Sequence, residues 1–404
     1  MRTRYGISPW LREFPAARRP AYPRFRGDRT ADVVIVGGGL TGCAIAYACA
    51  AAKLDTVLLE ADRIGEGSAG RGAGLLTSEP GPLFRDVAQA HGVRSARRVF
   101  DAWRRGVLDG SALLRRLKIK CDLEPQDSFL VGGHDAEKWL RREYEARHEA
   151  DLVLAWVTQK QIEKNLKLHA AAGLRTSDGF TLDPYRAVVG LAVASARRGA
   201  EIFEHSRVRK VRFTRKDVDV VADGGTIHAG HVVVATGSAP AEFKALRRHF
   251  TRREMYLVMT EALPAAVRKQ LIPPGTVLRD THTPPHRLRW VGDRLLIAGG
   301  DQDETPARLR NAVLVQRTGQ LMYEALTMNP AISGVQPEYG WDASYGHTAD
   351  GLMYIGAHRN YPHHLFALGG GSDSVTGAFV AARIILRALQ GSADKADEVF
   401  GWAR

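Results

Sequence analysis

Three glycines and one acid near the start of the chain have the types and the spacing needed to bind a dinucleotide. Gly37, Gly39 and Gly42 form a Gly-x-Gly-x-x-Gly sequence, and Glu60 follows at close to the ~20-residue separation of dinucleotide folds. The first glycine permits a tight turn, the second lets the backbone approach a pyrophosphate, and the third lets a helix pack closely on a sheet. Glu60 can accept hydrogen bonds from an adenosine ribose, whereas an arginine there would indicate a 2′-phosphate.

The sequence around these residues predicts the elements that must position them. The apolar run 33–36 predicts a buried parallel strand, and the small apolar residues 40–52 predict a helix. Free N–H groups and the partial positive charge at the start of this helix would attract phosphate. A second strand, 56–59, ends directly before Glu60. The strand, turn, helix and terminal acid together favour a dinucleotide site over a glycine-rich turn that binds nothing.

The remaining sequence predicts more elements than one small domain needs. A second glycine-rich loop, 63–76, follows where an extended dinucleotide would leave the first phosphate site. We expect a loop at 178–184 and helices at 83–117, 135–149, 185–198 and 375–389. We expect strands at 201–204, 208–213 and 218–222, and strands that end in a glycine turn at 231–238, 295–300 and 365–371. This order fits a nucleotide domain assembled from separated pieces, with a second domain inserted between them.

The bulk properties narrow the class of protein. The chain has 404 residues, three cysteines and a formal net charge of +13. Its basic residues are scattered, so we expect no nucleic-acid partner, although the charge keeps a flavoenzyme acting on RNA as an alternative. No apolar run approaches the ~20 residues of a membrane helix, and 1–30 lacks the apolar core of a secretory signal. Sparse cysteines favour a reducing compartment, and we expect a cytoplasmic protein.

Other catalytic patterns are missing from the sequence. His282 and His286 are separated by prolines, which argues against a metal-binding pair on one helix, and we expect no metal. The chain contains no Cys-x-x-Cys, no Walker loop and no Gly-x-Ser-x-Gly elbow. A metalloenzyme or a serine hydrolase is therefore not predicted.

Four stretches of the sequence have a composition typical of one known family. They are Pro9-Trp-Leu with Tyr22-Pro23 before 31–34, the loop 66–74, Trp341 with 348–356, and 366–376. Together they resemble the D-amino-acid-oxidase superfamily of FAD-dependent oxidoreductases, in particular its bacterial γ-glutamylputrescine-oxidase-like and glycine/D-amino-acid-oxidase branch. The sequence departs from the pattern at Gly72, Met353, Gly370 and Asp373, where relatives usually carry Asn, Pro, Tyr and Asn.

The resemblance implies an α/β fold with a discontinuous, Rossmann-like FAD-binding domain and an inserted α+β substrate domain. The implied boundaries are an N-terminal arm at 1–30, an FAD-binding domain from 31–82, 175–240 and 341–395, and a substrate domain from 83–174 and 241–340. Non-covalent FAD is expected, because no cysteine after Cys121 is present to form a C-terminal thioether.

The fingerprint and the resemblance together imply a set of FAD contacts in four parts of the chain. The acid Asp373 would oppose negative charge on a reduced flavin, so it is expected to point away and to cap the following helix. The implied contacts are Gly37, Gly39, Leu40, Thr41, Gly42, Glu60, Ala61, Arg63, Gly67, Ser68, Arg71, Ala73, Gly74, Leu75, Val208, Ala235, Thr236, Gly237, Gly369, Gly371, Ser372, Asp373, Val375 and Thr376.

Four further residues are candidates for the substrate. Arg289 resembles the arginine of a Tyr-x-Arg segment in relatives and would hold a carboxylate in a bidentate pair, with a structural arginine as the open alternative. Tyr256, Trp341 and Tyr345 would line an aromatic pocket, with plain core packing as the alternative. His347 is expected to be a hydrogen-bonded buried histidine rather than a base.

The implied reaction is oxidation of the C–N bond of an amine or amino acid to an imine, with dioxygen as the acceptor. The alternatives are a flavin dehydrogenase that passes electrons to a quinone or carrier and a nicotinamide-dependent dehydrogenase. The altered turn at 370–374 also leaves open an FAD-binding scaffold with little turnover. The oligomeric state is not predicted.

Overall fold

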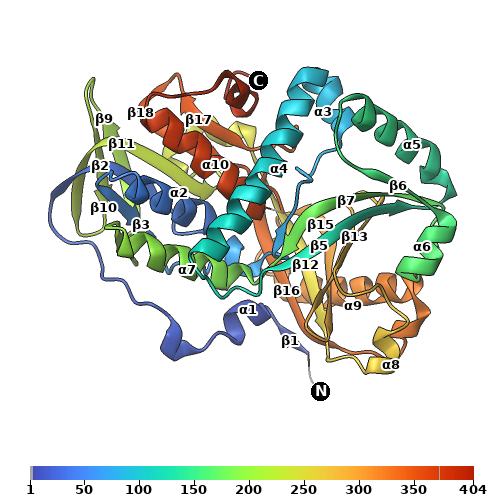
Figure 1. The fold of residues 1–404 in the computed structure, drawn as a ribbon. Coiled ribbons are helices and arrows are strands. Elements are labelled where there is room, and N and C mark those ends of the chain that lie inside the picture. The colour runs from blue at the N-terminus through green and yellow to red at the C-terminus, as the bar shows by residue number, and fades with distance from the viewer. Residues whose placement is uncertain (1–2, 373) are drawn as a thin grey trace.

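The structure, a computed structural model, describes residues 3–372 and 374–404. In these residues the chain forms two β-sheets, one of eight strands and one of ten, each covered by helices (Figure 1). The smaller sheet lies on the left of Figure 1 and the larger on the right, with long helices between and around them.

The eight-stranded sheet has a parallel core built around the first strand of the fingerprint. Strand β2 (Arg29–Val36) lies between β3 (Thr56–Leu59) and β11 (Gly225–Gly237) and is parallel to both. β8 (Glu201–Phe203) and β18 (Tyr361–Leu368) extend the parallel core on its two sides. The antiparallel strands of this sheet are β9 (Val208–Phe213), β10 (Val218–Ala222) and β17 (Tyr354–His358). From Val33 to Ile35 the β2 side chains are apolar and buried on both faces of the sheet, because both faces are covered there.

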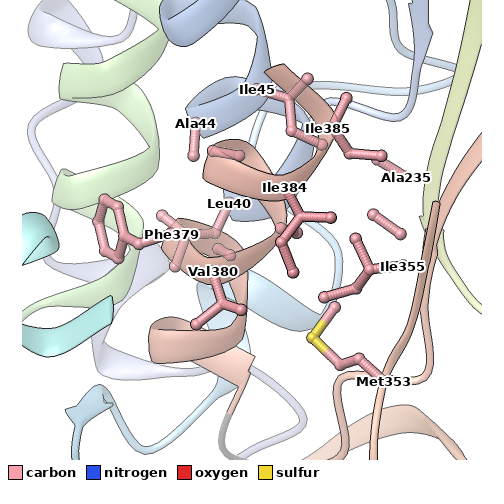
Figure 2. Close-up of a cluster of buried hydrophobic side chains, with 14 of the residues drawn as sticks. Leu40, Ala44, Ile45, Ala235, Met353, Ile355, Phe379, Val380, Ile384 and Ile385 are labelled. Carbon is pink, nitrogen blue, oxygen red and sulfur yellow. The ribbon is translucent and has the colours of Figure 1, made fainter. Parts of the chain in front are cut away.

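Helix α2 begins directly after the glycine turn and is enclosed by other helices. α2 (Leu40–Ala51) packs between α10 (Ser374–Leu389) and α7 (Pro184–Arg197), and α4 (Val93–Arg116) packs on α10. Figure 2 shows α2 and α10 side chains gathered in one buried cluster, with Met353 and Ile355 beside them. This packing fixes the first turn of α2 against the sheet, at the place where the fingerprint predicts a phosphate.

The ten-stranded sheet is mainly antiparallel and collects strands from distant parts of the chain. Its order is β1-β16-β12-β15-β14-β13-β5-β7-β4, with β6 beside β7. The strands are β1 (Arg4–Tyr5), β4 (Leu75–Leu76), β5 (Glu124–Gly132), β6 (Ala155–Thr158), β7 (Ala172–Thr181), β12 (Thr251–Thr260), β13 (Thr276–Asp280), β14 (Arg287–Val291), β15 (Arg294–Asp303) and β16 (Pro337–His347).

Helices α9 (Arg310–Met328), α5 (His134–Glu149) and α6 (Gln159–Leu166) pack on the larger sheet. α9 packs against β12, β15 and β16, while α5 and α6 pack near β7. The remaining helices are α1 (Pro9–Arg12), α3 (Phe84–His91) and α8 (Ala265–Arg268). None of the described helices combines the length and the apolar composition of a membrane span.

Most predicted elements are confirmed, and two differ. The predicted helical region 83–117 is divided into α3 and α4 at Gly92, whose φ of +83° a side chain would strain. The predicted loop 178–184 is wrong over its first four residues, because 178–181 form the end of β7 and 179–181 pair with β5 there. This pairing depends on a strand some fifty residues earlier, which local sequence does not reveal.

Three segments that the sequence assigns to the FAD-binding domain contribute strands to the larger sheet. They are 75–76 in β4, 175–181 in β7 and 341–347 in β16. Through these three segments the chain passes from one sheet to the other. The second glycine-rich loop, which ends at β4, therefore lies beside the larger sheet.

Candidate active site

The first glycine turn has the shape that the fingerprint predicts. Gly37 has a φ of +110°, and a Cβ there would lie 2.7 Å from the Ala235 main-chain oxygen. A Cβ on Gly42 would collide with the main-chain oxygen of Gly37, so the helix can pack here only through a glycine. A Cβ on Gly39 would meet no heavy atom within 4 Å. The backbone at Gly39 is therefore open to a ligand, as close approach to a pyrophosphate requires.

Glu60 braces the same turn. Its Oε2 accepts a hydrogen bond from the Gly38 N–H at 2.6 Å, and its Oε1 accepts one from the Asp62 N–H at 2.8 Å. Burial raises the pKa of Glu60, although these main-chain bonds act in the opposite direction. Because each carboxylate oxygen can accept a further bond, the predicted ribose contact stays compatible with this geometry. The sequence did not indicate the bracing role.

A long groove, here called the nucleotide groove, runs from this turn across the carboxyl ends of the parallel strands. Its volume is about 790 Å³. Arg207, Arg209 and Met353 also line it, and the sequence did not single them out for this position. The predicted FAD contacts that line the groove are Gly37, Gly39, Leu40, Thr41, Glu60, Ala61, Arg63, Gly67, Ser68, Val208, Ala235, Thr236, Gly237 and Gly371.

A smaller hollow, the connecting pocket, continues the groove toward the larger sheet. Leu40, Ser68, Tyr345 and Gly371 line both spaces. Pro184, Met255 and Ala343 also line the connecting pocket. The predicted contacts that line it are Leu40, Ser68, Ala73, Gly74, Leu75, Gly371, Ser372 and Val375. The structure therefore places residues from all three glycine-rich segments along one continuous path.

The last glycine turn lies against the end of β11. The Gly369 N–H donates a hydrogen bond to the main-chain oxygen of Gly237 at 2.8 Å, and both Gly369 and Gly371 have positive φ, +78° and +66°. Asp373, expected to point away from the flavin, lies outside the described residues. α10 follows this turn in the chain and begins at Ser374.

Two further predicted contacts support the walls of the site. Arg71 directs its guanidinium to the Gly6 main-chain oxygen at 3.3 Å. Thr376 Oγ1 accepts from the Thr77 N–H at 2.9 Å and donates to the Thr77 main-chain oxygen at 2.8 Å. Thr376 thereby ties α10 to the segment that follows β4.

Two more cavities lie beyond the connecting pocket. The inner cavity, of about 50 Å³, is lined by Leu75, Thr77, Glu79, Gly81, Ser128, Phe129, Leu130, Arg147, Leu174, Thr176, Phe180, Val277, Arg279 and Arg287. The outer cavity, of about 750 Å³, shares Gly81, Arg279 and Arg287 with it. Leu75 lines both the inner cavity and the connecting pocket, so the two spaces are neighbours.

The four substrate candidates are not brought together. Tyr345 lines the nucleotide groove, the connecting pocket and the outer cavity, and its hydroxyl donates to Asp301 Oδ1 at 2.5 Å. None of the four cavities found in the described part of the chain is lined by Tyr256, Trp341 or Arg289. Tyr256 is buried, and its hydroxyl donates to Glu254 Oε2 at 3.1 Å. Trp341 is fully buried and donates from Nε1 to the Arg71 main-chain oxygen at 2.8 Å.

Arg289 is directed toward the N-terminal arm. Its Nη2 donates to the Leu182 main-chain oxygen at 3.0 Å, and its guanidinium lies 5.3 Å from the centroid of the Trp10 ring. Burial lowers the pKa of Arg289 to about 10. This placement favours the structural alternative that the sequence left open.

Arg279 and Arg287 instead stand at the boundary between the inner and outer cavities. They are directly opposite each other on the antiparallel strands β13 and β14, so their side chains leave the same face of the sheet. Both Nη atoms of Arg279 donate to the Gly81 main-chain oxygen at 3.1 Å, and Arg287 Nη2 donates to Ser372 Oγ at 3.1 Å. The two guanidinium groups link the larger sheet to the Gly81 loop and to the last glycine turn.

The open backbone at Gly39 and the continuous lining of the groove and the connecting pocket fit an extended dinucleotide cofactor. The profile of the DAO family, described as FAD dependent oxidoreductase, matches residues 32–388. The chain belongs to the DAO family. FAD is therefore its cofactor, and the residues that line the nucleotide groove and the connecting pocket are those that would hold it.

Similar proteins agree with membership of the DAO family. The chain is 26% identical to gamma-glutamylputrescine oxidoreductase of Escherichia coli (strain K12) over 384 residues, 91% of this chain and 85% of that protein. It is 25% identical to glycine oxidase of Bacillus licheniformis, with 84% and 87% of the two chains covered. The crystal structure of glycine oxidase from Geobacillus kaustophilus has the same fold, with a TM-score of 0.77, 19% identity and coverage of 93% and 99%.

A buried ionic network in this DAO-family chain was missed by sequence reasoning. Arg147 donates from Nη1 and Nη2 to the two carboxylate oxygens of Glu79 at 2.8 and 2.9 Å, and from Nε to Glu143 at 2.7 Å. Burial alone would raise the pKa of Glu79, but Arg147 and then Arg279 hold it below its ordinary value. The i,i+4 spacing of Glu143 and Arg147 is visible in the sequence, whereas the burial of both side chains is not.

Proposed function

We propose that the chain oxidises the C–N bond of an amine that carries a carboxylate, such as an amino acid, and yields an imine. The main observation supporting this is the position of Arg279 and Arg287, which line both the inner and the outer cavity beside the FAD-binding path. Two guanidinium groups facing one space suit a carboxylate, because each offers several N–H donors in a fixed plane. The names of the relatives, a gamma-glutamylputrescine oxidoreductase and a glycine oxidase, point to substrates of this class.

The chain's own contribution is binding and orientation. Arg279 and Arg287 would bind the carboxylate at the boundary of the two cavities. Leu75, Phe129 and Val277 would surround the carbon skeleton and limit the access of water to it. Leu75 also lines the connecting pocket, so a substrate held here would lie next to the bound cofactor. The inner cavity is narrow and the outer cavity is wide. This favours a substrate whose reacting end is small and whose other end is longer and occupies the outer cavity.

The atoms and electrons of the proposed reaction are accounted for by the substrate, FAD, water and dioxygen. When bound, FAD supplies a two-electron acceptor for the oxidation. The substrate loses one hydrogen from carbon together with the electron pair of that bond, and one proton from nitrogen, whose bonding pair becomes the second bond of the C=N group. Water then hydrolyses the imine to a carbonyl compound and ammonia or a smaller amine. Dioxygen, which we propose as the acceptor, takes up two electrons and two protons and becomes hydrogen peroxide.

An anaerobic survey of compounds tests this function. The purified FAD-loaded protein is mixed with matched pairs of amines, one with and one without a carboxylate, and the loss of flavin absorbance is followed. We expect rapid bleaching by at least one carboxylated amine and release of hydrogen peroxide when air is admitted. If no amine or amino acid bleaches the flavin, the scaffold alternative replaces this proposal. Bleaching that only a quinone or a carrier protein reverses would identify a dehydrogenase instead.

A further inference from the structure

The loop between β13 and β14 gathers three potential metal ligands that the proposed reaction does not use. Asp280 is the last residue of β13, and His282 and His286 follow before β14 begins at Arg287. Asp280 Oδ2 lies 2.7 Å from Nδ1 of His282 and 2.6 Å from Nδ1 of His286. One ligand atom of each residue lies within 4.8 Å of the others.

The loop backbone is built to hold this arrangement. Asp280 Oδ1 accepts hydrogen bonds from the N–H groups of His282 at 3.1 Å and His286 at 2.8 Å. The Asp280 N–H in turn donates to the main-chain oxygen of His286 at 3.1 Å. One carboxylate oxygen thus organises the loop while the other faces both imidazoles. The prolines at 284 and 285, which argue against a helical pair of histidines, are compatible with this loop.

A second carboxylate lies on the opposite side of His286. The Nε2 atom of His286 lies 2.7 Å from Glu324 Oε2 on α9 in an ion-pair contact, while its Nδ1 faces Asp280. Gly299 on the neighbouring strand leaves room for the ring, because a Cβ there would lie 2.6 Å from Cδ2 of His286. A carboxylate on the far nitrogen of a histidine is the arrangement that orients metal-binding imidazoles in known sites.

We propose that Asp280, His282 and His286 bind a divalent transition-metal ion of the zinc type. Two imidazole nitrogens and one carboxylate oxygen are ligands that Zn²⁺ accepts, and Glu324 would support the His286 ligand from outside. Asp280 and His286 are buried, whereas the His282 side chain is 71% exposed, so solvent can supply the remaining ligand. Bonds of roughly 2.0–2.1 Å to tetrahedral zinc would require the ligand atoms to separate to about 3.3 Å. The exposed ring of His282 can move by this amount, and the Asp280 carboxylate and the His286 ring, now 2.6 Å apart, would also have to separate.

The ion would act on the loop and would not contact the substrate. Thr283, Pro284 and Pro285 of the same loop line the outer cavity, and Arg287 follows His286 directly. A bound metal would join the loop, through His286 and Glu324, to α9. The site is independent of the proposed reaction, since none of its three ligands lines the four cavities in the described part of the chain.

Zinc binding to the untagged, FAD-loaded protein tests the proposal. Protein treated with a chelator is titrated with Zn²⁺ by calorimetry, and its zinc content is measured after dialysis. We expect one zinc per chain in the wild type. Glu324→Gln should weaken binding by roughly 10- to 100-fold, as loss of an outer-shell partner typically does. His282→Ala and Asp280→Asn should weaken it further, and the amide introduced by Asp280→Asn would keep an oxygen for the two main-chain bonds.

A matched histidine–carboxylate pair elsewhere provides the control. His228 Nδ1 lies 2.7 Å from Asp219 Oδ1 at an exposed site that has no second histidine in contact with that carboxylate among the described residues. His228→Ala should therefore bind zinc as the wild type does, and retained FAD absorbance would show that each variant is folded. The proposal is overturned if the wild type takes up no stoichiometric zinc, or if His282→Ala and Asp280→Asn bind it within threefold of the His228→Ala protein.

Discussion

The indole Nε1 of Trp341 donates a hydrogen bond to the main-chain oxygen of Arg71 at 2.8 Å. This bond joins β16 of the larger sheet to the second glycine-rich loop, whose neighbouring residues line the FAD path. The N-terminal arm holds the same loop: Trp10 Nε1 donates to the Gly72 main-chain oxygen at 3.0 Å, and Ser8 Oγ donates to that of Gly70 at 2.6 Å. Trp341, which the sequence assigns to a substrate pocket, thus stabilises the second glycine-rich loop.

Replacing Trp341 by Phe should therefore weaken FAD binding and leave substrate recognition nearly unchanged. The ring would still fill most of the buried space, but the Arg71 carbonyl would lose its partner. We expect a roughly five- to tenfold higher Kd for FAD, since a hydrogen bond of this kind contributes about 1 kcal/mol. Fluorescence titration of the apoprotein with FAD measures the effect. Trp290→Phe is a matched control, because Trp290 Nε1 donates to the Ile272 oxygen at 2.8 Å in a separate core. A change confined to KM of the amine would show that Trp341 faces the substrate.

Replacing Gly39 by Glu should abolish FAD retention without unfolding the protein. The new side chain would leave the backbone where no heavy atom lies within 4 Å, and it would place a negative charge where a pyrophosphate approaches. The ratio of flavin to protein absorbance after gel filtration reports the loss, and circular dichroism reports the fold. Gly319→Glu on exposed α9, where an added Cβ also meets nothing within 4 Å, should retain FAD fully. Stoichiometric FAD in the Gly39→Glu protein would show that the diphosphate binds elsewhere.

The ionic network of Glu79 predicts a pH-dependent contribution to stability. Because the fold lowers the pKa of Glu79, its contribution is present above the ordinary value of 4.5 and is lost as the pH falls through the lowered value. At pH 7 we expect Glu79→Gln to reduce the free energy of unfolding by about 2 kcal/mol. This is less than for a fully buried pair, because the Glu79 side chain is 21% exposed.

Urea unfolding with excess FAD, repeated from pH 7 downward, measures this contribution. The difference between wild type and Glu79→Gln should shrink once the pH passes below 4.5. Asp223→Asn tests a carboxylate whose partner Arg209 lies at the surface, and it should change stability little at any pH. A difference for Glu79→Gln that is constant with pH would contradict a role for its charge.

Substitutions of Arg287 and Arg289, the two arginines of β14, should have different effects on the oxidation of substrates. Arg287→Gln should lower kcat/KM for carboxylated amines by roughly 10- to 100-fold, since hydrogen bonds to charged groups contribute about 1.5–3 kcal/mol. It should affect amines without a carboxylate much less. Arg289→Gln should instead lower thermal stability, because it removes the bond to the Leu182 oxygen, and should affect both kinds of amine alike. Steady-state kinetics with matched substrate pairs decides between them. If Arg289→Gln lowers kcat/KM for carboxylated amines only, Arg289 binds the carboxylate, as the sequence predicts.

The nucleotide side of the site could be predicted from the sequence because its parts are local. Residues 33–60 contain the strand, the glycine turn, the helix and Glu60 in chain order, and each has a steric or hydrogen-bonding reason for its type. The bracing of Gly38 by Glu60 escaped prediction, since it depends on the rotation of one side chain.

The substrate side was decided by tertiary structure. Arg287 and Arg289 are two residues apart on one strand, so they leave the same face, and sequence periodicity cannot distinguish them. Only the pairing of β14 with β13 and the path of the N-terminal arm place Arg287 beside Arg279 at the cavities and Arg289 beside Trp10. Likewise, Glu79 meets Arg147 across a sequence separation of 68 residues. The sequence by itself determined the phosphate turn, because short-range sterics specify a strand, turn and helix, and the resemblance of four stretches implied the family and FAD. Which charged side chains face the substrate depended on long-range packing.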